Sequence, residues 1–280
     1  MTLKIALPNK GSLSDAATSI LKEAGYRQRT DSRDLVFYDP SADVEFYYLR
    51  PRDIAVYVGS GELEIGITGR DLLIDSGAEA EEILGLDFGK SRFRFAARNE
   101  LQLSDLSGKR IATAYPGLVS HYLAQKGLKA LVVKLDGAVE SSIQLGVADV
   151  IADVVSTGGT LKQAGLVVFG DPILESEAIV IKRKGAQLRD DVATLIRRLQ
   201  GVVIARQYVL VDYDVEEKNL EAACKVTPGL ESPTISPLQK SGWVAVRAMV
   251  TRSSIHHVMD DLYGVGARGI LVTDIHASRL

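Results

Sequence analysis

The residues of this chain best suited to chemistry lie between positions 149 and 161. An apolar strand at 150–155 carries Asp153 near its end and leads into a loop of small residues: Ser156, Thr157, Gly158, Gly159 and Thr160. Glycines allow the backbone to approach a ligand closely, and hydroxyls with helix N–H groups can surround a phosphate. An acidic residue ahead of such a cradle suits the hydroxyls of a ribose. The segment predicts a site for a phosphorylated sugar, although the same pattern also occurs in ordinary tight turns.

Two earlier turns place a cation shortly after a strand and ahead of a helix. Lys10 can put a point charge on an anion at a helix N-terminus, and Arg50 can bind a phosphate with two parallel hydrogen bonds. For Lys10 the alternative is an exposed lysine beside a capped helix. Arg52 and Asp53 are expected to form a solvated pair with each other.

Three further side chains can take part, each with an alternative role. Asp71 begins a helix and is either a site carboxylate or one favoured by the helix dipole. Tyr115 can stack on a purine ring or fill the core. Glu140 precedes a helix and can reach a ribose hydroxyl or an adenine edge. With Asp153 it would stabilise positive charge that develops at a sugar C1 atom.

Short apolar strands alternate with amphipathic helices over the first two thirds of the chain, which predicts an α/β fold with ligands bound beyond the strand ends. A second α/β unit begins near residue 93, and strands at 166–169 and 178–182 are expected to return the chain to the first. We expect a two-lobed core like that of periplasmic binding proteins. One lobe would hold residues 1–90 with 179–207, and the other would hold residues 91–178.

The last stretch, residues 208–280, has a different order of elements. Strand, helix, two strands, helix and strand follow one another, which is typical of ferredoxin-like (ACT-like) domains. No catalytic cluster lies in it. A regulatory or assembly role is therefore expected for this domain.

Composition and missing motifs exclude several classes of protein. The formal net charge of −3 with mixed signs argues against a nucleic-acid or membrane partner. The single cysteine, Cys224, excludes an internal disulfide. The chain begins with a strand instead of a signal segment and contains no bilayer-spanning stretch, so we expect a cytoplasmic protein. A P-loop and metal-ligand spacing of histidines are also missing from the sequence.

Taken together, these segments resemble the ATP phosphoribosyltransferases of the long, regulated form, the first enzymes of histidine biosynthesis. The resemblance covers the chain from end to end, with the motifs in the order of the family. It is carried by Pro8-Asn9-Lys10-Gly11, Gly59-Ser60-Gly61-Glu62-Leu63, Gly66-Ile67-Thr68-Gly69-Arg70-Asp71, Asp153 to Thr160, and Pro228-Gly229-Leu230-Glu231-Ser232-Pro233-Thr234-Ile235.

The resemblance implies that N1 of the ATP adenine attacks C1 of 5-phosphoribosyl diphosphate, giving N1-(5-phosphoribosyl)-ATP and diphosphate. Mg²⁺ would be held mainly by substrate oxygens, with no dedicated protein ligands. The implied catalytic groups are Lys10, Asp71, Glu140 and Asp153. The implied substrate-binding residues are Arg50, Tyr115, Asp153, Val154, Ser156, Thr157, Gly158, Gly159 and Thr160.

The resemblance also implies feedback inhibition by histidine, with AMP as a second candidate inhibitor. The enzyme would form a homodimer and an inhibited homohexamer without a separate regulatory subunit. Alanine stands in the family where this chain has Gly269. The implied histidine-binding residues are Asp214, Leu230, Ser232, Thr234 and Gly269.

Two readings from other classes stay open at this point. One is a two-lobed protein that binds a small anion without chemistry, and the other is a cytosolic ligand sensor. A transcriptional sensor would need a DNA-binding segment, and the sequence shows no helix-turn-helix or basic stretch. Product formation from ATP and 5-phosphoribosyl diphosphate separates all three.

Overall fold

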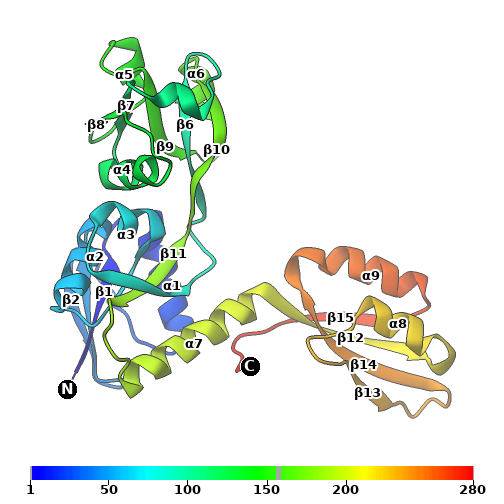
Figure 1. Ribbon diagram of the computed structural model, residues 1–280. Coiled ribbons are helices and arrows are strands. Elements are labelled where there is room, and N and C mark those ends of the chain that lie inside the picture. Colours follow the sequence, from blue (N-terminus) through cyan, green and yellow to red (C-terminus); the bar gives the residue numbers. More distant parts are fainter. Residues whose placement is uncertain (1, 156–158, 280) are drawn as a thin grey trace. The chain divides into compact units, whose positions relative to one another are not determined.

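The computed structural model describes residues 2–155 and 159–279 (Figure 1). The chain divides into two compact units, each described by itself below. Unit 1 comprises Met1–Lys22 with Tyr26–Ala193, and unit 2 comprises Glu23–Gly25 with Thr194–Leu280. The division falls within helix α7 (Asp190–Gln207).

A six-stranded sheet forms the first half of unit 1, with strand order β2-β3-β1-β4-β11-β5. Strand β1 is parallel to β3 and β4, whereas β11 is antiparallel to β4 and β5. The strands are β1 (Leu3–Pro8), β2 (Val36–Asp39), β3 (Val44–Leu49), β4 (Ile65–Gly69), β5 (Ala80–Gly85) and β11 (Ala178–Arg183). With helices α1 (Ser12–Glu23), α2 (Pro51–Ser60) and α3 (Arg70–Ser76), this sheet makes lobe I.

A five-stranded sheet forms the second half of unit 1, with strand order β10-β6-β9-β7-β8. Its strands are β6 (Ser91–Ala97), β7 (Arg110–Thr113), β8 (Leu131–Lys134), β9 (Val150–Val155) and β10 (Val167–Ser176). Helices α4 (Pro116–Gln125), α5 (Ser141–Gln144) and α6 (Gly159–Gln163), with a 3-10 turn at Leu103–Leu106, complete lobe II.

The chain passes between the two sheets twice. It enters lobe II along β6 and leaves along β10, and these strands are antiparallel with Ser91 opposite Ser176. Strand β11 then pairs with β4 in the first sheet. The predicted two-lobed α/β core and the return of the chain at 178–182 are confirmed, whereas the strand predicted at 166–169 belongs to the sheet of lobe II, because β10 pairs with β6.

The lobes have separate apolar cores. In lobe I, Ile54 and Val58 of α2 pack with Ile179 and Ile181 of β11. In lobe II, Phe93 belongs to a core built by the strands of the sheet, α4 and the 3-10 turn. Pro51 occupies the first turn of α2, where its missing N–H costs nothing. The turns that carry functional side chains are therefore attached to buried elements.

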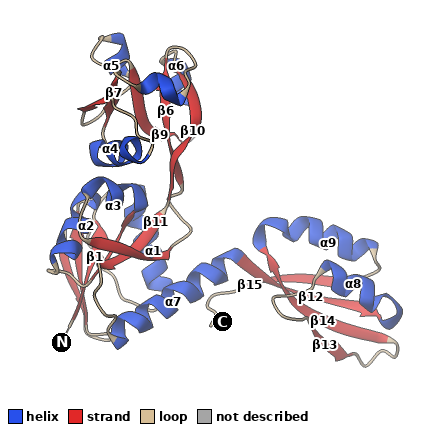
Figure 2. Cartoon of the chain, viewed as in Figure 1, coloured by secondary structure: helices blue, strands red, loops and turns tan. Residues whose placement is uncertain are grey.

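Unit 2 contains the predicted βαββαβ order (Figure 2). Its sheet is antiparallel with strand order β13-β14-β12-β15, and α8 and α9 pack on one face. Along β12 the odd-numbered residues from Val209 to Val215 are buried, and the even-numbered ones face the open side. The elements are β12 (Tyr208–Glu216), α8 (Leu220–Val226), β13 (Thr234–Pro237), β14 (Trp243–Thr251), α9 (Ile255–Gly264) and β15 (Arg268–Asp274), with 3-10 turns at Glu217–Asn219 and Arg252–Ser254.

The structure corrects one predicted helix. The segment 139–145 is helical only over α5 (Ser141–Gln144), because the backbone turns into the left-handed region at Ala138, with φ 46°, and again at Gly146, with φ 69°. Among the described residues, no helix is both long enough and apolar enough to cross a membrane.

Candidate active site in a cavity of unit 1

A cavity of about 890 Å³ lies where the strand-to-helix turns of lobe I meet lobe II. Three turns of lobe I and the connection that enters lobe II at Ser91 form most of the lining, and two further residues come from elsewhere in lobe II. They are Asn9 to Leu13, Arg50 to Asp53, Gly69 to Leu72 (without Arg70), Gly89 to Ser91, Tyr115 and Val154. The volume suits a ligand of nucleotide size.

The cationic wall of the cavity comes from the turns after β1 and β3. The parallel pairing of these strands brings Lys10 and Arg50 to the same edge of the sheet, and the N–H of Asn9 donates to the carbonyl of Leu49 at 2.8 Å. The Oδ1 atom of Asn9 is buried and has no hydrogen-bond partner within residues 2–155 and 159–279. The cations of this wall can bind an anion, and Oδ1 of Asn9 can accept a hydrogen bond from a hydroxyl or amino group of a ligand.

Arg52 connects the two lobes instead of pairing with Asp53, so the predicted solvated pair is wrong. Its Nη1 atom donates to Oδ2 of Asp75 at 3.1 Å, and its guanidinium carbon lies 4.5 Å from the centre of the Tyr115 ring. The other carboxylate oxygen, Oδ1 of Asp75, accepts the N–H of Gly117 at 2.9 Å. A cation and a carboxylate of lobe I therefore hold the N-terminus of α4 in lobe II.

Tyr115 forms part of the lobe II wall. Its ring packs edge-to-face on Phe93 with the ring centres 5.2 Å apart, and Arg52 lies over it. Burial, followed by the negative charge of Asp71, raises the pKa of Tyr115 to about 12. The phenol therefore stays protonated near neutral pH and is available as a hydrogen-bond donor, not as a base.

Asp71 begins α3 and is buried, with 9% of its surface exposed. Its N–H donates to Oγ of Ser176 at 3.0 Å, and the Ser176 hydroxyl donates back to Oδ1 of Asp71 at 3.0 Å. A carboxylate favoured only by the helix dipole would not need such a partner. The structure thus places Asp71 in the cavity wall with a fixed side chain.

Asp153 and Glu140 form the carboxylate pair of lobe II, outside the residues that line the cavity. Burial is the main cause that raises the pKa of Asp153; the negative charge of Glu140 adds to it, and the positive charge of Arg52 opposes it. Oδ1 of Asp153 accepts the N–H of Val154, a lining residue, at 2.7 Å. Asp153 therefore lies beside the cavity and responds to charges from both lobes.

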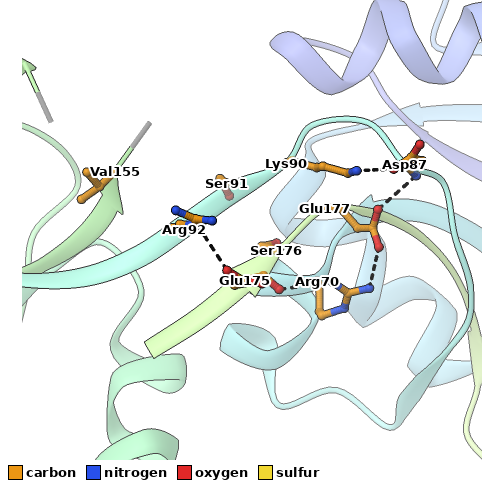
Figure 3. Close-up of a pocket in the computed structure, with 9 residues that line it drawn as sticks. All are labelled: Arg70, Asp87, Lys90, Ser91, Arg92, Val155, Glu175, Ser176 and Glu177. Atoms are coloured by element: carbon orange, nitrogen blue, oxygen red, sulfur yellow. Dashed lines mark hydrogen bonds and ion pairs between the residues drawn. The ribbon is translucent and has the colours of Figure 1, made fainter. Parts of the chain in front are cut away.

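A second cavity, of about 510 Å³, lies at the two crossings between the lobes (Figure 3). Its charged side chains are largely paired with one another. Arg70 bonds to Glu177 at 3.0 Å and to Glu82 at 2.7 Å, and Arg92 bonds to Glu175 at 3.2 Å. Because these charges neutralise each other, this cavity is better suited to fixing the crossings than to binding an anion.

The predicted site residues fall into three groups. Lys10, Arg50, Asp71, Tyr115 and Val154 line one cavity. Asp153 precedes the lining residue Val154, and Glu140 acts on the pKa of Asp153 through its negative charge. Ser156, Thr157 and Gly158 are outside the described residues, as is the side chain of Thr160, while Gly159 is the exposed first residue of α6.

Among the predicted histidine-binding residues, Asp214 and Gly269 lie together, because a Cβ added at Gly269 would be 3.5 Å from Oδ2 of Asp214. Leu230, Ser232 and Thr234 lie in or next to β13 and are partly or fully exposed. Strand β14 separates β13 from β12 in the sheet, so the two groups are not adjacent along it.

The carboxylates of the site do not form a metal cage. Among the described residues, no group of three or more histidine, cysteine, aspartate or glutamate side chains could hold an ion. Mg²⁺ commonly takes one or two carboxylates together with substrate phosphates. Asp71 and Asp153 fit that mode, in which the substrate brings most of the ligands.

Sequence reasoning missed Asn9, Arg52 and Ser176. Asn9 and Arg52 stand next to predicted residues in the same turns, which is the one signal that could have found them. Ser176 carried no such signal, since it lies 105 positions from Asp71 along the chain.

The chain is similar to known proteins over nearly its whole length. Residues 50–201 match the family model described as ATP phosphoribosyltransferase, and residues 205–277 match the model of the HisG C-terminal domain. An ATP phosphoribosyltransferase of Pseudarthrobacter chlorophenolicus is 60% identical, with 99% of this chain and 100% of that protein covered. One from Salinispora tropica is 58% identical, again over 99% of this chain and 100% of that protein.

A solved structure is also similar. The ATP phosphoribosyl transferase (HisG:HisZ) complex from Thermotoga maritima contains a chain with 27% identity and a TM-score of 0.60. The match covers 71% of this chain and 96% of that one.

Proposed function

Because the chain belongs to the ATP phosphoribosyltransferase family, in the long form that carries the C-terminal domain, we propose that the cavity of about 890 Å³ in unit 1 is the site of phosphoribosyl transfer. The activity is that of a transferase of histidine biosynthesis. One observation supports this location above all. Lys10 and Arg50 of lobe I line the same cavity as Val154, and its neighbour Asp153 responds to the charges of Arg52 in lobe I and Glu140 in lobe II.

The reaction joins two anionic substrates. The lone pair of adenine N1 in ATP forms the new bond to C1 of 5-phosphoribosyl diphosphate, and the C1–oxygen bond breaks with its electrons leaving on diphosphate. Positive charge develops at C1 in the transition state. Catalysis then depends on bringing the substrates together and on stabilising this charge.

Each wall of the cavity has a distinct task in this proposal. Lys10 and Arg50 bind the phosphates, because a cation and a bidentate guanidinium match those oxygens. Asp153 and Glu140 stabilise the charge at C1 and hold ribose hydroxyls. Residues 156–160, with Val154, bind the 5-phosphate, as their hydroxyls and glycines suggest.

Tyr115 borders the purine, with Arg52 covering part of its ring. Its protonated phenol can donate a hydrogen bond to the nucleotide. Mg²⁺ would be bound mainly by the diphosphate, and Asp71 is a carboxylate of the cavity wall that could contribute to holding it. When bound, the ion neutralises charge on the leaving group.

Unit 2 supports a regulatory role. We assign residues 208–280 to histidine binding and the two lobes to residues 1–90 with 179–207 and to 91–178. Asp214 suits the cationic amine or imidazolium of histidine, and the hydroxyls of Ser232 and Thr234 suit its carboxylate. AMP as a second inhibitor, and a homodimer that becomes a hexamer, belong to the same proposal.

The test is direct. The purified chain is mixed with ATP, 5-phosphoribosyl diphosphate, Mg²⁺ and pyrophosphatase, and N1-(5-phosphoribosyl)-ATP is followed by its ultraviolet absorbance. Lys10→Ala should slow turnover at least tenfold, since a hydrogen bond to a charged group is worth about 1.5–3 kcal/mol. The matched control is Lys22→Ala, because Lys22 is an exposed lysine in the last turn of α1.

Turnover in the unmodified chain, lost in the first variant and kept in the second, supports the location. A chain that binds both substrates without forming product would be an anion-binding protein instead.

A further inference from the structure

The hydroxyl of Ser176 is a buried polar group that the proposed reaction does not use directly. Ser176 ends β10, has 5% of its surface exposed, and lies at the crossing between the lobes (Figure 3). Among the described residues, the Ser176 hydroxyl has two hydrogen bonds, both with Asp71: it accepts the backbone N–H and donates to Oδ1. A buried hydroxyl needs partners, and this one finds both of them on a single residue.

Gly69 restricts the same carboxylate oxygen from another side. A Cβ added at Gly69 would lie 2.3 Å from Oδ1 of Asp71, far closer than van der Waals contact allows. The backbone itself does not require glycine there, because φ is −82°. Space for the Asp71 carboxylate is what requires it. Ser176 thus donates a hydrogen bond to Oδ1, and the missing side chain of Gly69 leaves the space that Oδ1 occupies.

The neighbouring pair keeps Ser176 in place. Arg70 donates its backbone N–H to the carbonyl of Glu177 at 3.0 Å, and its guanidinium bonds to the Glu177 carboxylate at 3.0 Å. Two consecutive residues of α3 therefore bond to two consecutive residues of the crossing. The position of the Ser176 hydroxyl relative to α3 is fixed by this pairing.

We propose that Ser176 is a positioning residue of the phosphoribosyl transfer, which holds the Asp71 carboxylate in one orientation in the cavity wall before the substrates bind. The inference rests on the proposed function, in which Asp71 faces the diphosphate and nucleotide. Its physical basis is preorganisation: a side chain already fixed by a second residue need not be ordered during the reaction. Ser176 itself need not touch either substrate.

Two variants release the carboxylate by different routes. Ser176→Ala removes the hydroxyl, and Gly69→Ala displaces Oδ1 while leaving the hydroxyl in place. Each should lower kcat about tenfold with KM for ATP changed less than threefold, the size expected for one hydrogen bond to a charged group. Partial unfolding would also lower the apparent kcat, because it lowers the concentration of active enzyme, so kcat is calculated for the folded fraction of each variant.

Matched controls separate positioning from stability. Thr227→Val in unit 2 removes a fully buried hydroxyl that bonds to Tyr213, and a Cβ added at Gly264 meets nothing within 4 Å. Thr227→Val and Gly264→Ala should therefore keep the kcat of the unmodified enzyme. Thermal unfolding of all four variants identifies any that are destabilised.

A double-mutant cycle with Asp71→Asn decides whether Ser176 acts through Asp71. In the Asp71→Asn background, Ser176→Ala should change kcat less than twofold. An equal loss in both backgrounds would overturn the proposal, as would full activity of Gly69→Ala. Absence of turnover in the unmodified chain would instead refute the transferase site, and the role of Ser176 with it.

Discussion

The guanidinium carbon of Arg52 lies 4.5 Å from the centre of the Tyr115 ring, so a cation of lobe I covers an aromatic residue of lobe II. The same guanidinium is hydrogen-bonded to Asp75, and its charge lowers the pKa of Asp153, opposing the effect of burial. Arg52 therefore connects the geometry of the lobes to the ionisation of the carboxylate beside the cavity.

This connection predicts opposite pH effects for two variants. If ionised Asp153 stabilises the charge at C1, kcat/KM should fall as pH drops through its raised pKa. Arg52→Gln removes the positive charge that lowers this pKa, so the acid limb should move to higher pH. Glu140→Gln removes a negative charge that raises it, so the limb should move to lower pH. Normalised pH profiles of kcat/KM measure both shifts, and limbs that move in the same direction would contradict the role of Asp153.

Asp75 should be important for the stability of unit 1. Its carboxylate is mostly buried and accepts bonds from Arg52 and from the N–H groups of Gly117 and Leu118. Asp75→Ala should lower the free energy of unfolding by about 1–3 kcal/mol, because charged and backbone donors lose their acceptor. Denaturant titration gives this quantity.

Asp149 provides the control for that measurement. It accepts the guanidinium of Arg110 at 2.8 Å and the backbone N–H of Arg110 at 2.9 Å, and these bonds lower the pKa of Asp149 to about 2. Both side chains are about 40% exposed, so water screens the pair and can replace the lost acceptor, and Asp149→Ala should cost less than Asp75→Ala. Equal losses in the two variants would mean that the contact with α4 adds nothing beyond a surface ion pair.

The loop at 156–160 makes a separate prediction about the sugar donor. Thr157→Ala combined with Thr160→Ala should weaken binding of 5-phosphoribosyl diphosphate by about 2–4 kcal/mol, taking about 1–2 kcal/mol for each hydrogen bond to phosphate. Calorimetry measures the affinity for the donor, and the KM for ATP serves as the internal control. An unchanged affinity for 5-phosphoribosyl diphosphate would mean that the loop at 156–160 does not bind its 5-phosphate.

Asp214 should determine the response to histidine. Asp214→Asn removes the charge that would pair with the cationic ligand, so the inhibition constant should rise at least tenfold, in line with about 1.5–3 kcal/mol for a charged hydrogen bond. Asp212→Asn is the matched control, because this aspartate lies two residues away on β12 and already bonds to Arg247 at 2.7 Å. Steady-state inhibition assays compare them. Similar effects of both changes would mean that inhibition depends on the total negative charge of the sheet face not covered by α8 and α9, and not on Asp214 itself.

The sequence predicted the fold well because local signals carried it. Alternating apolar strands and amphipathic helices indicated the α/β core, and the different order of predicted elements after residue 207 indicated the βαββαβ unit. Strands β2 and β5 went unpredicted, since they are short and partly exposed and lack a clear apolar pattern. The helix expected at 139–145 was too long because tight turns flank α5.

Long-range partners could not be predicted. The cations of lobe I were found because each follows a strand, and parallel strands end at one edge of a sheet. The predicted partner of Arg52 was wrong because the prediction relied on Asp53 being its neighbour in sequence. The actual partner, Asp75, comes close to Arg52 through the packing of α2 and α3. Ser176 reaches Asp71 only through the crossing strands, which no local pattern reveals.

The antiparallel meeting of Ser91 and Ser176 has a consequence for how such a protein could arise and be rebuilt. The entry and exit of lobe II lie side by side, so the whole lobe is topologically an insertion into a self-contained sheet. A gene fusion at these two short connections could replace lobe II with another domain and leave the strand order of the first sheet unchanged. Exchange of lobe II at these two connections offers a route to an enzyme with a new specificity for the phosphoribosyl donor.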